Sequence, residues 1–358
     1  MEIFKDLLVV ELASVLAGPA AGLFFAELGA KVIKVENSTT GGDMTRNWRL
    51  PTESKTTKES SYYCSVNWNK QVLSLDFSQD SDRQQVISIC KKADIVISNY
   101  KKESAIKFGL SYEQLKIENP KLIYAQLNSY SETDNTPAFD IVMQAETGFL
   151  HMTGEADRAP VRMPVALIDI MAGHQLKEGI LCALLQRERT GKGSYLSVSL
   201  FESAVASLAN QATNWLMEAQ IPQRMGAQHP NIAPYGDMFQ TADNQAIVLA
   251  VGTENQFQKL CNCLNINDLI INNDFNNNAS RVMNRVELND ILAKAFLNFD
   301  KNVILPILKN SGVPCGSIND MKAVFEMPET QHLILEDTLS DGQLARRVKT
   351  KIFEIKTE

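Results

Sequence analysis

Strand-like and helix-like segments alternate through the first part of the chain, and this alternation constrains the fold more than any other feature of the sequence. Residues 7–12 form a short apolar run typical of a buried strand, and Gly29 ends a helical stretch that begins near Ala20. The elements expected here are strands at 7–12, 30–36, 72–77, 94–98 and 122–127 and helices at 20–28 and 81–92. Strands that alternate with helices favour an α/β fold with a mostly parallel sheet and helices on both faces.

A second set of elements follows. The sequence TGKG at 190–193 ends a predicted helix over residues 169–189, and alternating apolar and polar residues predict a half-buried strand at 195–200. A further helix is expected at about residues 202–217. The Pro-, Gly-, Gln- and Asn-rich residues 222–236 are interpreted as a linker.

Beyond the linker, the sequence predicts a smaller α/β unit. It has a strand at 246–251 and a capping box formed by Thr253 and Gln256 at the start of a helix. The other expected elements are an asparagine-rich mobile surface loop at 265–278, helices at 281–297 and 301–309, and a strand at 348–355 that joins the first domain. The predicted domains are therefore residues 1–220 joined by 327–358, and a small domain with its linkers at 221–326.

Composition and charge narrow the possible partners. The formal net charge of −7 argues against nucleic acid, because phosphate binding needs Lys and Arg gathered on one face. The six cysteines and four histidines lack the spacing of a zinc site, so we expect neither a metal nor a disulfide framework. No secretory leader and no long apolar run occur, so we expect a soluble cytoplasmic protein without a membrane partner.

Three common catalytic arrangements are absent from the sequence. Gly18 and Gly22 form GxxxG rather than the GxGxxG of dinucleotide-binding proteins, so Glu36 is not expected to bind NAD. No P-loop motif occurs, and neither GxSxG nor a paired acid and histidine supports a Ser-His-Asp triad. His174 follows Asp169 by about one helical turn and is interpreted as an ordinary polar helix residue.

Several stretches, in order along the chain, resemble the class III coenzyme A transferases, a family that includes the α-methylacyl-CoA racemases. The matching stretches are residues 12–46, 67–70 (NWNK), 93–100 (ADIVISNY), 119–123 (NPKLI), 140–145 (DIVMQA), 169–200, 234–236 (PYG) and 313–316 (VPCG). The resemblance covers most of the chain and is strongest at 169–200.

This resemblance implies a fold and an activity. The implied fold is a large Rossmann-like, CoA-binding domain with a mostly parallel sheet and a smaller inserted α/β domain, in two subunits interlocked as rings. The implied activity moves coenzyme A from an acyl-CoA donor to a small carboxylic acid. Coenzyme A would then be part of the substrate, and no tightly bound cofactor is expected.

The resemblance also assigns site residues. Asp169 matches the family's catalytic aspartate, within a D-x-x-x-G pattern that Gly173 completes. In such transferases the aspartate attacks the thioester carbonyl, giving a mixed anhydride and then an aspartyl thioester with CoA. The residues assigned to CoA binding, of which the first two border the thioester, are Leu16, Ala17, Lys70, Asn99, Tyr100 and Lys107.

An aspartate suits this role on physical grounds. A carboxylate with an ordinary pKa of about 4 is ionised at neutral pH and needs no partner base, which fits the lack of a triad. A position at a helix N-terminus would further favour the ionised form. Without the resemblance, Asp169 would be interpreted as a helix N-cap.

The chain departs from the family pattern at several places. Racemases carry a His-Asp pair in a GHD motif, whereas residues 138–140 read AFD and lack the histidine. Residues 128–137 contain no glycine, Asn37 stands where some relatives have arginine, and the chain stops soon after Phe353, so nucleotide contacts and dimer wrapping are expected to differ. Acyl transfer is favoured, with a racemase-like enzyme or a non-catalytic acyl-CoA-binding homologue as alternatives.

Overall fold

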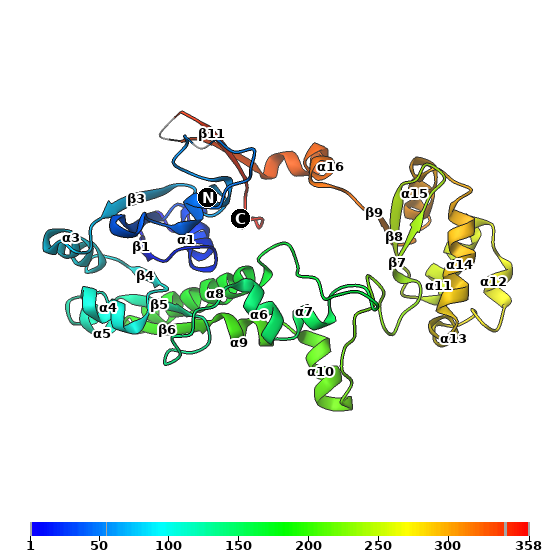
Figure 1. Cartoon of the computed structure of the whole chain (residues 1–358), viewed down its shortest axis with the longest axis horizontal. Coiled ribbons are helices and arrows are strands. Elements are labelled where there is room, and N and C mark those ends of the chain that lie inside the picture. The colour runs from blue at the N-terminus through cyan, green and yellow to red at the C-terminus, as the bar shows by residue number, and fades with distance from the viewer. Residues whose placement is uncertain (1, 55, 340–341, 357–358) are drawn as a thin grey trace. The chain divides into compact units, whose positions relative to one another are not determined.

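The computed structural model describes residues 2–54, 56–339 and 342–356, which fold into two units (Figure 1). The first unit comprises Met1–Leu150, Arg162–Ile221 and Gln331–Glu358, and the second comprises His151–Val161 and Pro222–Thr330. Both ends of the chain thus belong to the first unit. The second unit contains the segment His151–Val161, which no sequence pattern assigns to it.

Six parallel strands form the main sheet of the first unit, in the order β3-β2-β1-β4-β5-β6. Their bounds are β1 Leu8–Leu12, β2 Lys31–Asn37, β3 Lys70–Leu75, β4 Ile95–Ser98, β5 Ile123–Asn128 and β6 Ser194–Ser199. The predicted parallel α/β sheet is confirmed, and the strand ends differ from the predicted ones by at most two residues. The chain builds outward from β1 in one direction and from β4 in the other.

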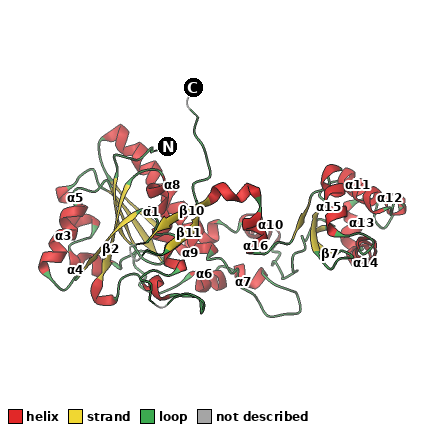
Figure 2. Cartoon of the chain, turned by 90° about the horizontal axis from the view of Figure 1, so that it is seen from above, coloured by secondary structure: helices red, strands yellow, loops and turns green. Residues whose placement is uncertain are grey.

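Helices cover both faces of this sheet (Figure 2). Helices α1 (Ala17–Glu27) and α8 (Leu167–Thr190) pack on the face that carries Val9, and α3 (Asp80–Cys90) and α5 (Tyr112–Glu118) pack on the face that carries Val10. Because successive strand residues point to opposite faces, burial of both explains the continuously apolar strands. The remaining helices of this region are α2 Ser61–Cys64, α4 Lys102–Phe108, α6 Asp140–Glu146, α7 Phe149–Met152, α9 Leu200–Ala206 and α10 Ala209–Glu218.

Two expectations for the first unit are wrong. The helix predicted at 202–217 is two helices, α9 and α10, which separate where Ala209 adopts a φ of 49°. The strand predicted at 348–355 is absent, because β10 (Ile334–Thr338) and β11 (Leu344–Val348) pair with each other in a separate two-stranded sheet. After β11 the Glu27 carboxylate accepts the backbone amides of Thr350 and Lys351, at 3.0 and 2.6 Å, in place of a neighbouring strand.

The second unit has a three-stranded antiparallel sheet packed against helices (Figure 1). Its elements are β7 Tyr235–Gln240, β8 Ala246–Ala250, β9 Cys315–Ser317, α11 Glu254–Leu264, α12 Asp268–Ile271, α13 Asn278–Met283, α14 Arg285–Phe296, α15 Lys301–Asn310 and α16 Met321–Glu326. The capping box of Thr253 and Gln256 is confirmed. No helix among the described residues is both long and apolar enough to cross a membrane.

The asparagine-rich segment is not the predicted surface loop. It contains α12, and Leu269 and Phe275 are buried in the core of the second unit. Asn265 ends α11 with a φ of 58°, and the Asn277 side chain accepts the amide of Ser280 at the start of α13. These asparagines therefore cap helices, a role that composition alone does not separate from loop formation.

Candidate active site

A cavity of about 220 Å³ lies at the carboxyl ends of β1, β4 and β5. Its walls come from residues 14–17 after β1, from residues 99–102 after β4, and from the last two residues of β5 and the segment that follows to residue 139, together with Asp169 and Leu200. The carboxyl ends of β1 and β4 are where an open α/β sheet of this order binds ligands. The cavity brings together five of the residues that the sequence singles out, namely Leu16, Ala17, Asn99, Tyr100 and Asp169.

Asp169 lies in the first turn of α8 and is 8% exposed. Within the described part of the chain its carboxylate has neither a hydrogen-bond donor nor a cation beside it. Burial, followed by the charge of Asp140, raises the pKa of Asp169 to about 7. The expectation of an ordinary, fully ionised aspartate is therefore wrong, because burial and the charge of Asp140 both raise its pKa.

Asp140, the first residue of α6, caps the helix that carries Asp169. Its Oδ2 accepts the backbone amides of Ile168 at 2.7 Å and Asp169 at 3.4 Å, and its Oδ1 accepts the side-chain amide of Gln144. In the sequence, Asp140 stands out only as the end of the altered GHD motif. Its retention in that motif was the one signal of a role near Asp169.

Gly173 sets how closely α8 approaches α1. A Cβ at Gly173 would lie 3.1 Å from the carbonyl oxygen of Ala17 and 3.5 Å from the Cβ of Ala20. The turn of α8 after Asp169 therefore lies against the start of α1. This contact gives the D-x-x-x-G spacing a structural reason, since one helical turn separates the aspartate from the point of close approach.

The two polar residues after β4 have different roles. The Asn99 side chain donates to the Ser14 carbonyl at 3.1 Å and accepts the Ser14 amide at 3.4 Å, so it holds the loop after β1. The Tyr100 ring packs edge-on against Phe77 and Phe108. Both residues also line a neighbouring cavity of about 380 Å³ that extends toward the end of β2.

The two lysines assigned to CoA binding lie outside the cavity that contains Asp169. Lys70 is buried, and its ammonium binds Glu11 at 2.7 Å, the Pro19 carbonyl at 2.8 Å and Asn67 at 3.1 Å. Burial lowers the pKa of Lys70 to about 8 even though Glu11 opposes that shift. Lys107 is exposed on α4, where its ammonium lies 5.9 Å from the centre of the Phe108 ring.

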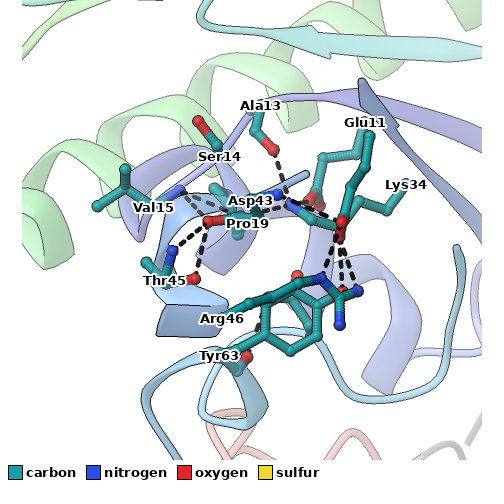
Figure 3. A network of polar contacts seen from close by, with 12 residues as sticks. Glu11, Ala13, Ser14, Val15, Pro19, Lys34, Asp43, Thr45, Arg46 and Tyr63 are labelled. Carbon is teal, nitrogen blue, oxygen red and sulfur yellow. Dashed lines mark hydrogen bonds and ion pairs between the residues drawn. The ribbon is translucent and has the colours of Figure 1, made fainter. Parts of the chain in front are cut away.

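A buried ionic cluster beneath the loop after β1 was missed by sequence reasoning (Figure 3). Lys34 on β2 binds Glu11 at 2.9 Å, Asp43 at 3.0 Å and the Ala13 carbonyl at 2.7 Å. Burial alone would lower the pKa of Lys34, but the two carboxylates outweigh it and raise that pKa. The sequence did contain one indication of the cluster, because each of two strands that it predicts as buried carries a charged residue, Glu11 in one and Lys34 in the other.

The comparisons with known proteins fit this geometry. Residues 4–357 match the family model described as CoA-transferase family III. The chain belongs to this family.

Similar proteins of the family III CoA-transferases include two with stated substrates and one solved structure. The succinate–glutarate CoA-transferase of Agrobacterium fabrum is 36% identical over 98% of this chain and 88% of its own. The human succinyl-CoA:glutarate CoA-transferase is 35% identical over 92% of this chain and 75% of its own. The crystal structure of a CaiB/BaiF family protein from Brucella suis has 36% identity and a TM-score of 0.86, over 98% of this chain and 92% of that chain.

Proposed function

We propose that this family III CoA-transferase moves coenzyme A from an acyl-CoA donor to a small dicarboxylic acid, with Asp169 as the covalent nucleophile. The observation that carries the proposal is the buried carboxylate of Asp169, in a cavity at the carboxyl ends of the sheet, to which no described residue donates a hydrogen bond or offers a cation. Burying an unpaired carboxylate costs free energy. A carboxylate that is nevertheless found there is more typical of a reacting group than of a structural one. The substrates named for the similar Agrobacterium and human enzymes, succinate and glutarate, support dicarboxylic acids as the substrate class.

The proposed reaction runs through four acyl exchanges. An Oδ of Asp169 attacks the donor thioester carbonyl, the C–S bond breaks, and CoA thiolate leaves a mixed anhydride on Asp169. The thiolate attacks the aspartyl carbonyl, releasing the donor acid and forming an aspartyl–CoA thioester. The acceptor carboxylate then attacks that thioester and expels the thiolate, which finally attacks the acceptor's acyl carbonyl. The product acyl-CoA leaves and the Asp169 carboxylate is restored.

The raised pKa of Asp169 fits these steps. Only the ionised carboxylate can attack the thioester, and a pKa of about 7 leaves a substantial ionised fraction at neutral pH. A carboxylate that is more basic than usual and poorly solvated is also a better nucleophile than an ordinary one. Coenzyme A takes part only as substrate and intermediate, so the steps require no tightly bound cofactor.

We place the thioester and the nucleotide in the two neighbouring cavities. The strand order 3-2-1-4-5-6 is that of doubly wound, Rossmann-like sheets, which bind nucleotides at the carboxyl ends of the central strands. Leu16 and Ala17 would border the thioester beside Asp169, and Asn99 and Tyr100, which line both cavities, would contact the part of CoA between the thioester and the nucleotide. Lys107 would reach the phosphates only from the surface of α4.

The resemblance to the family also leads us to propose an interlocked homodimer. Threaded rings cannot separate without unfolding, so the dimer should persist at nanomolar protein concentration. Sedimentation velocity at that concentration checks this, and a clean monomer would contradict it.

Replacement of Asp169 tests the proposed function. Asp169→Ala and Asp169→Asn should abolish transfer, because neither side chain offers an ionised oxygen, and loss of a nucleophile costs several orders of magnitude. With donor acyl-CoA and no acceptor, the wild type should form an adduct on Asp169 that hydroxylamine or borohydride traps and peptide mapping locates. Asp134→Asn, which changes another carboxylate of the same cavity, should still form the adduct. Transfer above a few per cent in Asp169→Ala would refute the covalent mechanism.

A further inference from the structure

We infer that Asp43 is a positioning residue for the transfer reaction, because it holds the backbone of Val15 in a strained conformation that fixes Leu16 and Ala17 beside Asp169. This inference rests on the proposed function of Asp169. It adds a residue that makes no contact with the thioester in the proposed mode of binding.

Val15 has an unusual backbone conformation. Its φ is 75°, in the left-handed region that β-branched residues avoid because the side chain collides with the backbone. Such a residue stays in that region only when its surroundings hold it there, and strain of this kind clusters at functional sites. Val15 directly precedes Leu16 and Ala17, where α1 begins.

Three side chains hold three consecutive residues of this loop. Asn99 binds the amide and the carbonyl of Ser14. Lys34 donates to the Ala13 carbonyl, and the Asp43 carboxylate accepts the Val15 amide at 3.3 Å (Figure 3). Asp43 is thus the group that restrains the strained residue itself. Lys34 also binds Asp43 at 3.0 Å, so the side chains that hold Ala13 and Val15 are themselves joined by an ion pair.

Asp43 is itself firmly held. It is 1% exposed and caps the 3₁₀ helix η2 (Met44–Asn47), since its Oδ1 accepts the amide of Thr45 at 3.0 Å and its hydroxyl at 2.7 Å. The backbone amide of Asp43 donates to Glu36, which also binds Arg46 in a two-pronged ion pair at 2.8 and 2.9 Å. Through Lys34 and Glu36, Asp43 therefore ties the loop after β1 to strand β2.

The position of this loop matters because α1 and α8 touch at their starts. The Ala17 carbonyl oxygen would lie 3.1 Å from a Cβ on Gly173, a tight contact one turn after Asp169. If Val15 relaxed to an ordinary φ, Leu16 and Ala17 would shift relative to the nucleophile. Misplacement of a reacting group by about 1 Å can cost about a hundredfold in rate.

A double-mutant cycle between positions 43 and 15 tests the inference. Asp43→Asn should lower kcat by about tenfold or more, since the Nδ2 group that faces Lys34 forces the side chain away from the Val15 amide. Glycine adopts a positive φ without strain, so the same change in the Val15→Gly background should cost about threefold or less. Thr45→Val is a milder second variant, because it removes the 2.7 Å hydroxyl hydrogen bond to Asp43 but keeps the carboxylate. Its loss of kcat should also be smaller in the Val15→Gly background.

Glu27→Gln serves as the control, because it breaks a comparably buried ion pair with Arg347 at the opposite end of α1. Its effect on kcat should be the same in the wild-type background and in the Val15→Gly background. Equal losses of kcat for Asp43→Asn in both backgrounds would overturn the inference. So would a rise in the KM for donor acyl-CoA at unchanged kcat, because Asp43 also lines the neighbouring cavity and would then be a ligand contact.

The two proposals fail separately. If Asp169→Ala keeps its transfer activity, the proposed function is wrong whatever the cycle shows. If Asp169→Ala is inactive and the cycle is additive, only the positioning role of Asp43 is wrong.

Discussion

The carboxylate of Asp140 accepts the backbone amide of Asp169 at 3.4 Å and that of Ile168 at 2.7 Å. The residue that caps α8 therefore also contributes negative charge beside the proposed nucleophile, and it is one of the two causes of the raised pKa of Asp169. Capping stabilises the helix, whereas the charge opposes ionisation of Asp169. These two effects can be separated by experiment.

Asp140→Asn should move the pH dependence of transfer to lower pH. Asparagine keeps an oxygen for the helix cap but removes the charge, so the pKa of Asp169 should fall while burial still holds it above the ordinary value. Because only ionised Asp169 reacts, the rise of kcat/KM with pH, expected near pH 7 in the wild type, should begin earlier in the variant. Asp134→Asn, an exposed change in the same cavity, should leave the midpoint in place. An unmoved midpoint in Asp140→Asn would contradict the assignment.

Asp169→Asn should be more stable than the wild type at pH 8. A carboxyl group whose pKa is about 7 when folded and about 4 when unfolded favours the folded state only while it is protonated, so the wild type loses stability as pH rises between those values. The loss has an upper limit of about 4 kcal/mol, which the amide avoids. Urea unfolding at pH 4.5 and pH 8 measures it. A gap between the two proteins that fails to widen with pH would show that Asp169 is solvated in the folded state.

Substitution of Lys70 should lower the free energy of unfolding much more than substitution of Lys107. Lys70→Met leaves Glu11 with one cation fewer in a buried cluster and should cost about 3–5 kcal/mol of unfolding free energy. Lys107→Ala changes an exposed side chain and should cost no more than about 0.5 kcal/mol. If Lys107 contacts the CoA phosphates, its loss should raise the KM for acyl-CoA and weaken the salt dependence of that KM. A fully stable Lys70→Met with a raised KM would instead make Lys70 the ligand contact.

Exchange of the α-proton should be negligible. Phe139, which is 47% exposed, stands where the resemblance places the histidine of racemases, and its side chain offers no acid or base. The centre of its ring lies 6.1 Å from that of Trp48. In heavy water, a 2-methylacyl-CoA should therefore remain unlabelled at its α-carbon during many transfer turnovers. Rapid deuterium uptake that disappears in Asp169→Ala would favour a racemase-like enzyme.

The sheet could be predicted from the sequence because parallel strands covered on both faces give continuous apolar runs, as in β1 and β4. Asp169 could be found by resemblance, and the end of its helix by the TGKG sequence at 190–193. The burial of its carboxylate could not, since it depends on Leu200, residues 14–17 and residues 127–139, which come together only in the folded chain.

Long-range polar pairing explains most of the other differences. The resemblance assigns Lys70 to CoA binding, and the sequence gives no sign that its ammonium binds Glu11, 59 positions earlier. Glu27 captures the backbone after β11 from more than 320 positions away and replaces the strand expected there. Local patterns contain no information about such partners. The asparagine-rich segment differs, because the apolar residues Leu269 and Phe275 were visible in the sequence. Their burial in the core holds the segment in place despite its many asparagines.

The cavity has one wall that is held rigidly by packing and buried ion pairs and one that is an exposed loop. Asp169, Leu16 and Ala17 sit on helix starts that Gly173 and the cluster around Lys34 lock in place, whereas residues 131–137 form an exposed, glycine-free connection on the other side. Changes in an exposed connection cost little folding free energy. Under the proposed function, we therefore expect substitutions along residues 131–137 to change which acids enter the cavity while the chemistry of Asp169 is kept, so libraries that seek altered substrates should be concentrated there.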